Sequence, residues 1–487
     1  MLKKSIATLR NHSAFFVISS VFFVLYALIS LLNHYFFRTY ALDLGLYTNA
    51  LYDYAHFRFN YSEVFKDHLE NLLSDHFDLF LMLVSPFYYL FGTYTLLIVQ
   101  IIFIHIGAAG IYKNVLLYHN NKRIALIVTS AFMIFYGVFS ALAFDYHSNV
   151  IASMLVPWLF YFFQKQHWKK SFFCVLLILI TKENMALWAG FICIGLFLLH
   201  FKEPVKKKYA SLFCAFSFLY FISVVQFIMP ALSSGGKYVH ADYHYFGNNF
   251  SEVISGIISN PLKAIKALFL NHSGDVRNNN FKAETYVFVL LSGGLVLLID
   301  FRFLLMLVPI FLQKMYHDNP VMWTVSRQYN IEFAPIISLC IIVTLVSIKK
   351  NKLKIILSSI FLALSIVATI RLGDNTYCYM DRNSIRLYQD GHYQSHYQVS
   401  KVYAAMKMIP PEAAVSAQSM FLPHLSLRDK IYQYPMIKDA NYIIVSLTKR
   451  SYPLNPQQLT DSVIQLQHSS GWETMYSEDN VFIFRKK

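Results

Sequence analysis

The sequence predicts an α-helical membrane protein that crosses the bilayer about eleven times and carries a small α/β domain at its C-terminus. Of its 487 residues, 56% are hydrophobic and only 14% are charged, whereas soluble domains have about 25% charged residues. The chain contains 44 Phe and 34 Tyr, which suits helices with aromatic belts at both membrane interfaces. The net charge of +15 is spread in short runs between apolar stretches. This pattern is typical of a membrane protein and not of a nucleic-acid-binding domain.

Membrane-spanning helices require roughly 20 apolar residues each. We expect them near 14–33, 94–112, 124–142, 149–164, 171–181, 185–201, 209–230, 285–299, 303–316, 329–348 and 353–371. The short fifth and ninth stretches are plausible spans only where other helices shelter their ends. The first stretch follows Lys3, Lys4 and Arg10 and is too long for a signal peptide, so we interpret it as an uncleaved helix.

Lysine and arginine residues concentrate in alternate loops, and such residues mark the cytoplasmic side. Basic runs at 206–208 and 349–354 fall on the side of the N-terminus, whereas the short loops of the other side hold little more than Lys182 and Arg327. This asymmetry predicts a cytoplasmic N-terminus, a transmembrane domain at 1–371 and an extracytoplasmic domain at 372–487.

Two large outer loops are predicted at 34–93 and 231–284. The first has two interfacial helices, one beginning near Asp43 and one at 75–91. Counting 75–91 as a span would invert every later loop, so we place it at the outer surface. The second loop has an amphipathic helix near 251–270.

The tail has the composition of a soluble α/β domain. It predicts helices near 395–408 and 456–467, strands at 413–417 and 441–447, and a final hairpin whose turn lies at 477–480.

Polar residues of chemical interest follow the outer ends of the helices, and a shared outer cavity would explain why they all fall on one side. They are Asp43, Asp75, His76, Asp78, Asp145, His147, Lys182, Glu183 and Arg327. The other outer histidines, His240, His244, His272 and His317, are scattered, and we interpret them as solvated.

Each of these residues has two interpretations. Asp43 is either a general base for an acceptor hydroxyl or an N-cap of the helix that follows it. Four residues are assigned to a divalent metal, Mg²⁺ or Mn²⁺: Asp75, His76, Asp145 and Glu183. In the alternative interpretation they form ion pairs and hydrogen bonds that hold the loops at the interface. Lys182 and Arg327 could both neutralise a phosphate. Alternatively, Lys182 forms a local ion pair with its neighbour Glu183, and Arg327 anchors its loop at the lipid headgroups.

Sharper motifs are missing from the sequence, which has no Walker A loop, GxSxG elbow, HExxH or CxxC. ATP-driven transport, serine hydrolysis and zincin chemistry therefore have no support from the sequence.

Several segments carry a family resemblance, namely LDLGLYTNALYD, SDHFDLFLMLVSPFYYLFG, FDYHSN, TKEN, QYNIEFAP and PPEAAVSAQSMFLPHLSLRDKIYQYP. The chain resembles the GT-C glycosyltransferases, which use polyprenyl-phosphate sugar donors on the extracytoplasmic face. Within that superfamily it looks most like the bacterial membrane family called domain of unknown function 2079, over nearly its whole length.

The resemblance implies that Asp43 is the catalytic acidic residue of the first outer loop. GT-C enzymes often have two adjacent acidic residues there, whereas Leu44 follows Asp43 here, so a metal directly at this point is not implied. Lys182, with Arg327 and His147, is then expected to bind the donor phosphate.

The resemblance further implies a glycosyltransferase of the bacterial cytoplasmic membrane whose partners are membrane lipids, a polyprenyl-phosphate-linked sugar and an extracytoplasmic acceptor. Two other functions remain open: a transporter or flippase of lipid-linked sugars, and a non-catalytic scaffold. Transporters usually place polar sites near the midplane in repeated halves, and the sequence shows no internal repeat.

Overall fold

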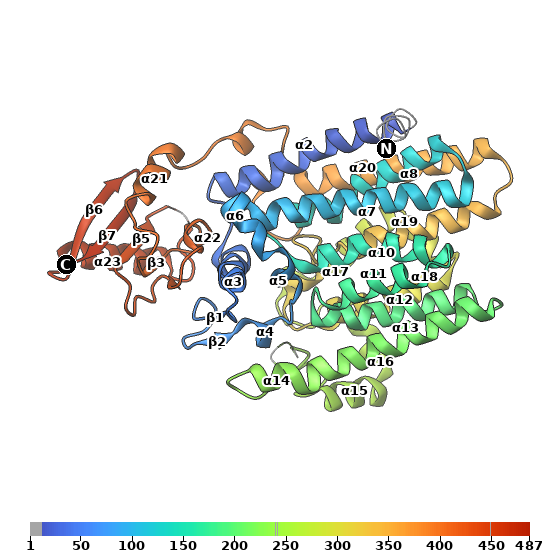
Figure 1. The fold of residues 1–487 in the computed structure, drawn as a ribbon, viewed down its shortest axis with the longest axis horizontal. Helices are drawn as coiled ribbons and strands as arrows, with labels where there is room; N and C mark the ends of the chain where they lie inside the picture. Colours follow the sequence, from blue (N-terminus) through green and yellow to red (C-terminus); the bar gives the residue numbers. More distant parts are fainter. Residues whose placement is uncertain (1–11, 239, 241, 449) are drawn as a thin grey trace.

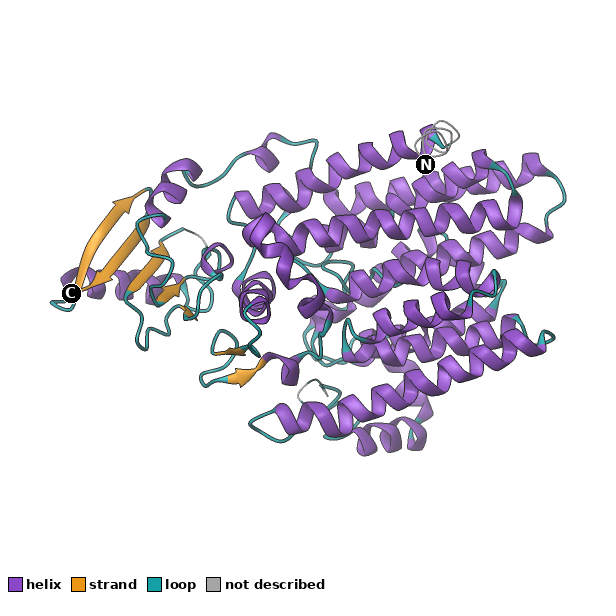
Figure 2. Ribbon diagram, in the orientation of Figure 1, coloured by secondary structure: helices purple, strands orange, loops and turns teal. Residues whose placement is uncertain are grey.

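The computed structural model describes residues 12–238, 240, 242–448 and 450–487. Lys3, Lys4 and Arg10, which entered the sidedness prediction, lie outside these residues. A bundle of long, roughly aligned helices forms most of the molecule, and a small sheet lies beyond one end of the bundle (Figures 1 and 2).

Helices occupy each of the apolar stretches that the sequence marks. They are α2 (Ser13–Tyr35), α7 (Thr95–His119), α8 (Lys122–Met133), α9 (Tyr136–Leu142), α10 (Ser148–Gln164), α11 (Trp168–Leu179), α12 (Glu183–Leu199), α13 (Pro204–Ser223), α17 (Phe281–Leu291), α18 (Phe301–Tyr316), α19 (Phe333–Thr344) and α20 (Asn351–Asp374). In the bundle, α10 packs against α7 and α11, α12 against α13 and α18, and α20 against α8.

The predicted count of about eleven spans is not confirmed. Within the described part of the chain, four helices are long and apolar enough to cross a membrane: Ser13–Tyr35, Phe80–His119, Pro204–Leu232 and Asn351–Asp374. The pair α8 and α9, bent by 44°, makes a fifth if it is one span. Other apolar helices, such as Glu183–Leu199, are shorter. The buried side chains of α12 show that neighbouring helices cover much of it.

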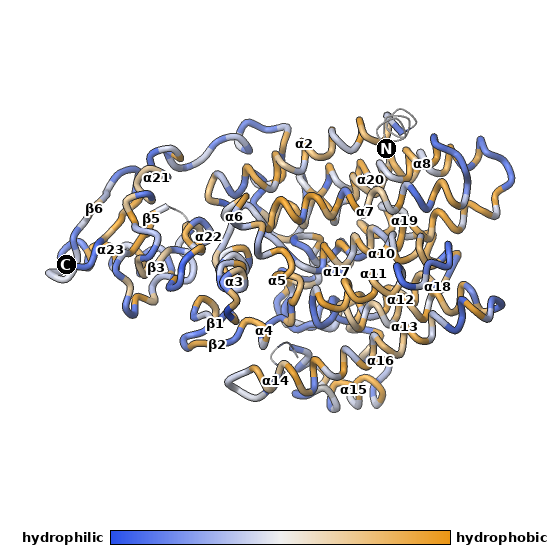
Figure 3. Tube along the Cα trace, in the orientation of Figure 1, coloured by the Kyte–Doolittle hydropathy of each residue, from blue (hydrophilic) through white to orange (hydrophobic). Residues whose placement is uncertain are grey.

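The basic turns gather at one end of the bundle. Helix α7 ends at His119, Asn120 takes a left-handed conformation (φ 47°), and the Asn121 side chain caps α8 by accepting from two backbone amides. The connections from α7 to α8, α12 to α13 and α19 to α20 all lie at the end away from the sheet (Figure 1), and hydrophilic segments mark that end in Figure 3. The basic turns therefore share one end of the bundle, and which side of the membrane that end faces stays a prediction.

The first loop lies at the opposite end, between the bundle and the sheet (Figure 1). It contains η1 (Ala41–Gly45), α3 (Leu46–Ala55), β1 (Tyr61–Ser62), β2 (Glu70–Asn71) and α4 (Leu72–Asp75). The predicted helix at 75–91 is instead a series of short turns that runs into α7: α5 (Phe80–Val84), η2 (Ser85–Phe87), α6 (Tyr88–Phe91) and η3 (Gly92–Tyr94). Pro86 helps to break it, because proline has no amide for the helical ladder.

The second loop follows η4 (Val224–Ile228) and α14 (Met229–Leu232), which continue α13. The single amphipathic helix predicted near 251–270 is split into α15 (Phe250–Ser259) and α16 (Pro261–Phe269). Asn260 caps α16 through the Lys263 amide, and Pro261 occupies the first helical position. Beyond α16, the short helices of this half of the chain are η5 (Val276–Asn278), η6 (Gly294–Leu298), η7 (Pro320–Trp323) and η8 (Leu345–Ser347).

The C-terminal segment holds a mixed five-stranded sheet in the order β4-β3-β5-β7-β6. Strand β3 runs parallel to β4 and β5, whereas β7 is antiparallel to β5 and β6. The elements are η9 (Arg382–Ser384), η10 (Asp390–Tyr393), α21 (Val399–Met406), β3 (Val415–Ala417), α22 (Leu422–Leu425), β4 (Ile431–Gln433), β5 (Tyr442–Ser446), α23 (Pro456–His468), β6 (Trp472–Glu478) and β7 (Val481–Lys486). Helices α21 and α23, strands β3 and β5, and the final hairpin lie where the sequence predicts them, whereas α22 and β4 were not predicted.

This segment is fixed to the first loop. The Arg38 guanidinium donates to the carbonyls of Asn383, Gly391, His392 and Gln394 at 2.5–3.1 Å. The Asn49 amide donates to the carbonyls of Ser426 and Arg428 at 3.0 and 2.9 Å. Phe37 packs edge-on against Phe421, so one apolar core runs through both parts.

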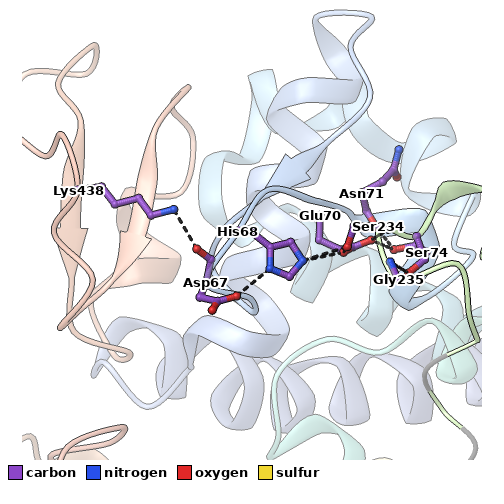
Figure 4. A network of polar contacts seen from close by, with 9 residues as sticks. Asp67, His68, Glu70, Asn71, Ser74, Ser234, Gly235 and Lys438 are labelled. Carbon is purple, nitrogen blue, oxygen red and sulfur yellow. Dashed lines mark hydrogen bonds and ion pairs between the residues drawn. The ribbon is translucent and has the colours of Figure 1, made fainter.

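A polar network joins the C-terminal segment to both outer loops (Figure 4). Lys438 donates to the Asp67 carbonyl at 3.1 Å, and His68 lies between the carboxylates of Asp67 and Glu70. Glu70 in turn accepts from Ser234 of the second loop. Three segments far apart in the sequence thereby hold one another at the outer end.

Candidate active site

Asp43 lies in the π-helical turn η1, directly before α3. Its side chain caps no helix, so the N-cap interpretation is wrong. The wider π turn shifts the register of the side chains around Asp43, and such turns occur frequently at functional sites. The carboxylate is 30% exposed, which leaves it accessible to a bound molecule.

The C-terminal segment contacts the η1 turn through Ser419 and α22. Ser419 accepts a hydrogen bond from the Ala41 amide at 3.2 Å, and α22 contacts η1. A Cβ atom on Gly45 would lie 2.5 Å from Leu422 Cδ2, so only glycine permits this close approach without a shift. The position of Asp43 therefore depends on residues near 420.

His147 faces Asp43. The imidazole Nε2 lies 4.0 Å from Asp43 Oδ1, and this buried nitrogen has no hydrogen-bond partner in the part of the chain that the structure describes. The ring stacks on Phe144, with centroids 5.4 Å apart and planes 6° apart. The Arg327 guanidinium also lies over Phe144, 4.5 Å from its centroid. Phe144 thus orients both a neutral nitrogen and a cation beside the same carboxylate.

Asp145 lies behind this group and not in a metal site. Its Oδ2 accepts from the Tyr40 amide at 3.0 Å, and its carbonyl accepts from Gln100 at 3.1 Å. Gln100 also accepts from the His147 amide at 3.0 Å. These bonds hold the 145–147 turn, in which Asp145 takes a left-handed conformation (φ 44°), against the start of η1.

Burial raises the pKa of Asp43 to about 6, and the nearby charges of Arg327 and Lys182 keep it from rising further. Burial, together with the charge of Asp43, also raises the pKa of Asp145 well above its usual value. Burial and the cations Lys182 and Arg327 lower the pKa of His147. The site therefore combines Asp43, whose pKa is about 6, with a second carboxyl group of raised pKa and an imidazole of lowered pKa.

A second cluster lies beyond Lys182. The Lys182 ammonium is 3.1 Å from His76 Nε2, while His76 Nδ1 is 3.3 Å from a Glu183 oxygen. The ring of His76 stacks on that of His240, with centroids 4.2 Å apart. His240 Nε2 is 3.1 Å from Asp75 Oδ1. Although burial opposes the shift, His76, His240 and Lys182 hold the pKa of Asp75 below its ordinary value.

The prediction that the outer histidines are solvated is wrong for His240, which belongs to this cluster. It is wrong in part for His272 and His317, which are partly covered, whereas the His244 side chain is 60% exposed. No sequence pattern marks His240 as a member of the cluster, because it reaches the cluster from the second loop, far along the chain from Asp75.

The four residues assigned to a metal do not form one ligand set. Among the described residues, the potential ligand atoms that lie within 4.8 Å of one another are those of Asp75, His76 and His240. Asp145 belongs to the Asp43 group, and Glu183 lies behind His76. Of the predicted phosphate ligands, His147 and Arg327 flank Asp43, and Lys182 lies toward the Asp75 cluster while its charge still acts on Asp43.

Tyr47 connects the two groups and was not predicted. Burial and the negative charges of Asp75, Asp43, Asp78 and Glu183 raise the pKa of its phenol, which places it within electrostatic reach of both groups. Tyr47 lies only four residues after Asp43, and this closeness along the chain was the available sequence signal.

The residues of the site lie within the region that matches a protein-family model. A sequence model described as "Predicted membrane protein (DUF2079)" matches residues 33–483. No curated protein matches the chain. Among solved structures, the cryo-EM structure of the arabinofuranosyltransferase AftD from Mycobacteria is similar, with a TM-score of 0.48 and 13% identity. The similarity covers 98% of this chain but only 40% of that one; at this level it carries no conclusion about activity.

Proposed function

The chain belongs to the family of predicted membrane proteins called DUF2079, and we propose that it is a glycosyltransferase of the GT-C type. In this proposal it moves a sugar from a polyprenyl-phosphate donor to an extracytoplasmic acceptor in the bacterial cytoplasmic membrane. The acceptor is a glycan, lipid or protein of the cell envelope, and the N-terminus is cytoplasmic.

The observation that carries the proposal is the setting of Asp43. A general base works best when its pKa lies near the operating pH, and burial raises that of Asp43 to about 6. The carboxylate is partly exposed, and the turn that carries it directly precedes α3, which lies at the end of the bundle away from the basic turns (Figure 1). Lipid-linked substrates can reach such a position from the membrane while an acceptor approaches from water.

In the proposed reaction, Asp43 takes the proton of an acceptor hydroxyl as that oxygen attacks the anomeric carbon. The bond from the anomeric carbon to the phosphate oxygen breaks, and the electron pair leaves with polyprenyl phosphate. The products are the glycosylated acceptor and polyprenyl phosphate, and the proton passes from Asp43 to water. No oxidant or nucleotide is consumed.

Cations near Asp43 suit the leaving phosphate. Arg327 offers a planar guanidinium that binds phosphate oxygens in pairs, and Lys182 offers a compact ammonium. The unpartnered His147 Nε2 completes the polar lining. Charge that develops on the phosphate during bond cleavage would be stabilised by these groups.

The test is transfer by the purified protein in nanodiscs that contain a panel of polyprenyl-phosphate sugars, read by mass spectrometry of lipid and acceptor products. A new glycosidic product that disappears in Asp43→Asn supports the proposal. Exchange of the intact lipid-linked sugar across the bilayer, without covalent change, would instead favour a flippase. Native mass spectrometry of the same preparation would show whether a polyprenyl phosphate copurifies.

A further inference from the structure

We propose that Asp75, His76 and His240 bind a divalent transition metal, Zn²⁺ or Mn²⁺, between the two outer loops. The role that we give to this ion rests on the proposed transferase function, but its binding does not. The three side chains come from α4, the residue after it and the second loop, which meet at the outer end of the bundle.

The ligand atoms already converge. Asp75 Oδ1 is 3.1 Å from His240 Nε2, and Asp75 Oδ2 is 3.9 Å from His76 Nε2. His240 Nε2 is buried and has no hydrogen-bond partner among the described residues, although Asp75 is close. Ligands of one metal at bond lengths near 2.0–2.2 Å lie roughly 3–3.5 Å apart. A small closure of these side chains would reach that spacing.

The tautomer of His76 leaves its Nε2 lone pair available to bind a metal. An ammonium has only donors, so Lys182 must donate to the Nε2 lone pair, 3.1 Å away. The proton of His76 is then on Nδ1, directed at Glu183. A second oxygen of Glu183 accepts from the Phe77 amide at 3.1 Å, which fixes the carboxylate. This carboxylate–histidine arrangement is typical of the outer shell of metal sites.

The ammonium of Lys182 lies beside the side chains that we assign as metal ligands. Its ammonium occupies the lone-pair side of His76, and its charge acts on Asp75 as well as on Asp43. A bound dication would take over this contact and repel the ammonium. Lys182 would then be free to turn toward Asp43 and the donor phosphate.

The donor set selects the ion. Mg²⁺ and Ca²⁺ prefer all-oxygen sites, whereas two imidazoles and one carboxylate suit Zn²⁺ or Mn²⁺. Three protein ligands leave a coordination position open, as catalytic sites do. In the transferase proposal, a phosphate oxygen of the donor takes that position and the ion offsets the charge of the leaving group.

The test is metal content. Protein without a polyhistidine tag is stripped with a chelator, loaded separately with ZnCl₂, MnCl₂ or MgCl₂, desalted, and measured by inductively coupled plasma mass spectrometry. We expect about one Zn²⁺ or Mn²⁺ per chain, little Mg²⁺, and loss of the ion in Asp75→Asn and His240→Ala. His244→Ala is the matched control, because His244 lies in the same loop, pairs with Asp318 and is exposed.

Glu183→Gln tests the outer shell separately and should lower affinity about 10- to 100-fold without abolishing binding. A Co²⁺ absorption band in the wild type that is lost in His240→Ala would report the ligand directly. Equal metal content in wild type and His240→Ala, in samples with matching size-exclusion profiles, would overturn the proposal. Transfer by metal-free protein would overturn the role of the ion but leave the transferase proposal intact. Stoichiometric metal binding without any transfer would overturn the transferase proposal but leave the metal site intact.

Discussion

The Nε2 atom of His147 lies 4.0 Å from Oδ1 of Asp43 and, within residues 12–238, 240, 242–448 and 450–487, has no hydrogen-bond partner. A hydroxyl oxygen placed between the two atoms could lie within normal hydrogen-bond distance of both. With neutral His147 and ionised Asp43, the acceptor would donate its proton to the carboxylate while the imidazole orients it.

Asp43→Asn should lower the rate of sugar transfer by about 10²-fold or more, because general-base catalysis contributes 10²–10⁴-fold. The isosteric amide keeps the turn but cannot take a proton. The measurement is the initial rate in the nanodisc assay. Asp53→Asn is the control, since Asp53 lies in the same loop and pairs with Arg58 at 2.8 Å. Wild-type rates in Asp43→Asn would exclude Asp43 as the base.

The pH profile should show an acidic limb near pH 6, below which Asp43 becomes protonated and transfer is lost. Arg327→Gln removes a charge that favours the ionised carboxylate, so the pKa of Asp43 rises and the limb moves to higher pH. Initial rates between pH 5 and 8.5 measure both midpoints. A limb in Arg327→Gln at the wild-type pH or below it would contradict this electrostatic relationship.

Asp43 should also lower the stability of the fold at neutral pH. Its pKa is raised from 3.8 to about 6 in the folded protein, so the native state binds more protons than the unfolded state between these values, and stability falls as pH rises through them. Asp43→Asn removes this dependence. The Tm of the variant should equal or exceed that of the wild type at pH 7.5, and the gain should shrink toward pH 4. Thermal unfolding in detergent measures it; a clearly lower Tm at pH 7.5 would indicate a structural carboxylate.

Gly45→Ala should disturb the turn that carries Asp43, because the new Cβ would lie 2.5 Å from Leu422 Cδ2. Overpacking of this kind costs about 1–3 kcal/mol. The double variant Gly45→Ala/Leu422→Ala should recover part of the loss, since the smaller side chain makes room. Transfer rate and Tm of the two single variants and the double variant form a cycle, and strictly additive effects would show that the two positions are not coupled.

Sidedness can be tested with single cysteines in a background without native cysteines. Asp67→Cys, at a side chain that is 92% exposed, should react with a membrane-impermeant maleimide added to intact cells. Lys207→Cys, in the basic turn at the other end, should react only after the cells are opened. The reverse labelling would place the candidate site in the cytoplasm.

The sequence predicts helix positions well because each helix needs a long apolar stretch, and the basic turns reveal which ends belong together. The number of spans stays a prediction, because a buried helix such as α12 and a lipid-exposed one are equally apolar. The sequence indicates that the polar residues around Asp43 and Asp75 lie close together, because all of them fall at the same ends of the predicted helices. Their division into two clusters could not be predicted, because Asp145 bonds the Tyr40 amide and His240 arrives from a remote loop.

The bond from the Ala41 amide to Ser419 has a consequence for biosynthesis. The turn with Asp43 is synthesised near the start of the chain and Ser419 near its end, so the turn lacks this bond until at least residue 419 of 487 has been made. A nascent chain, or one truncated before Ser419, would therefore hold Asp43 in a turn that lacks this support.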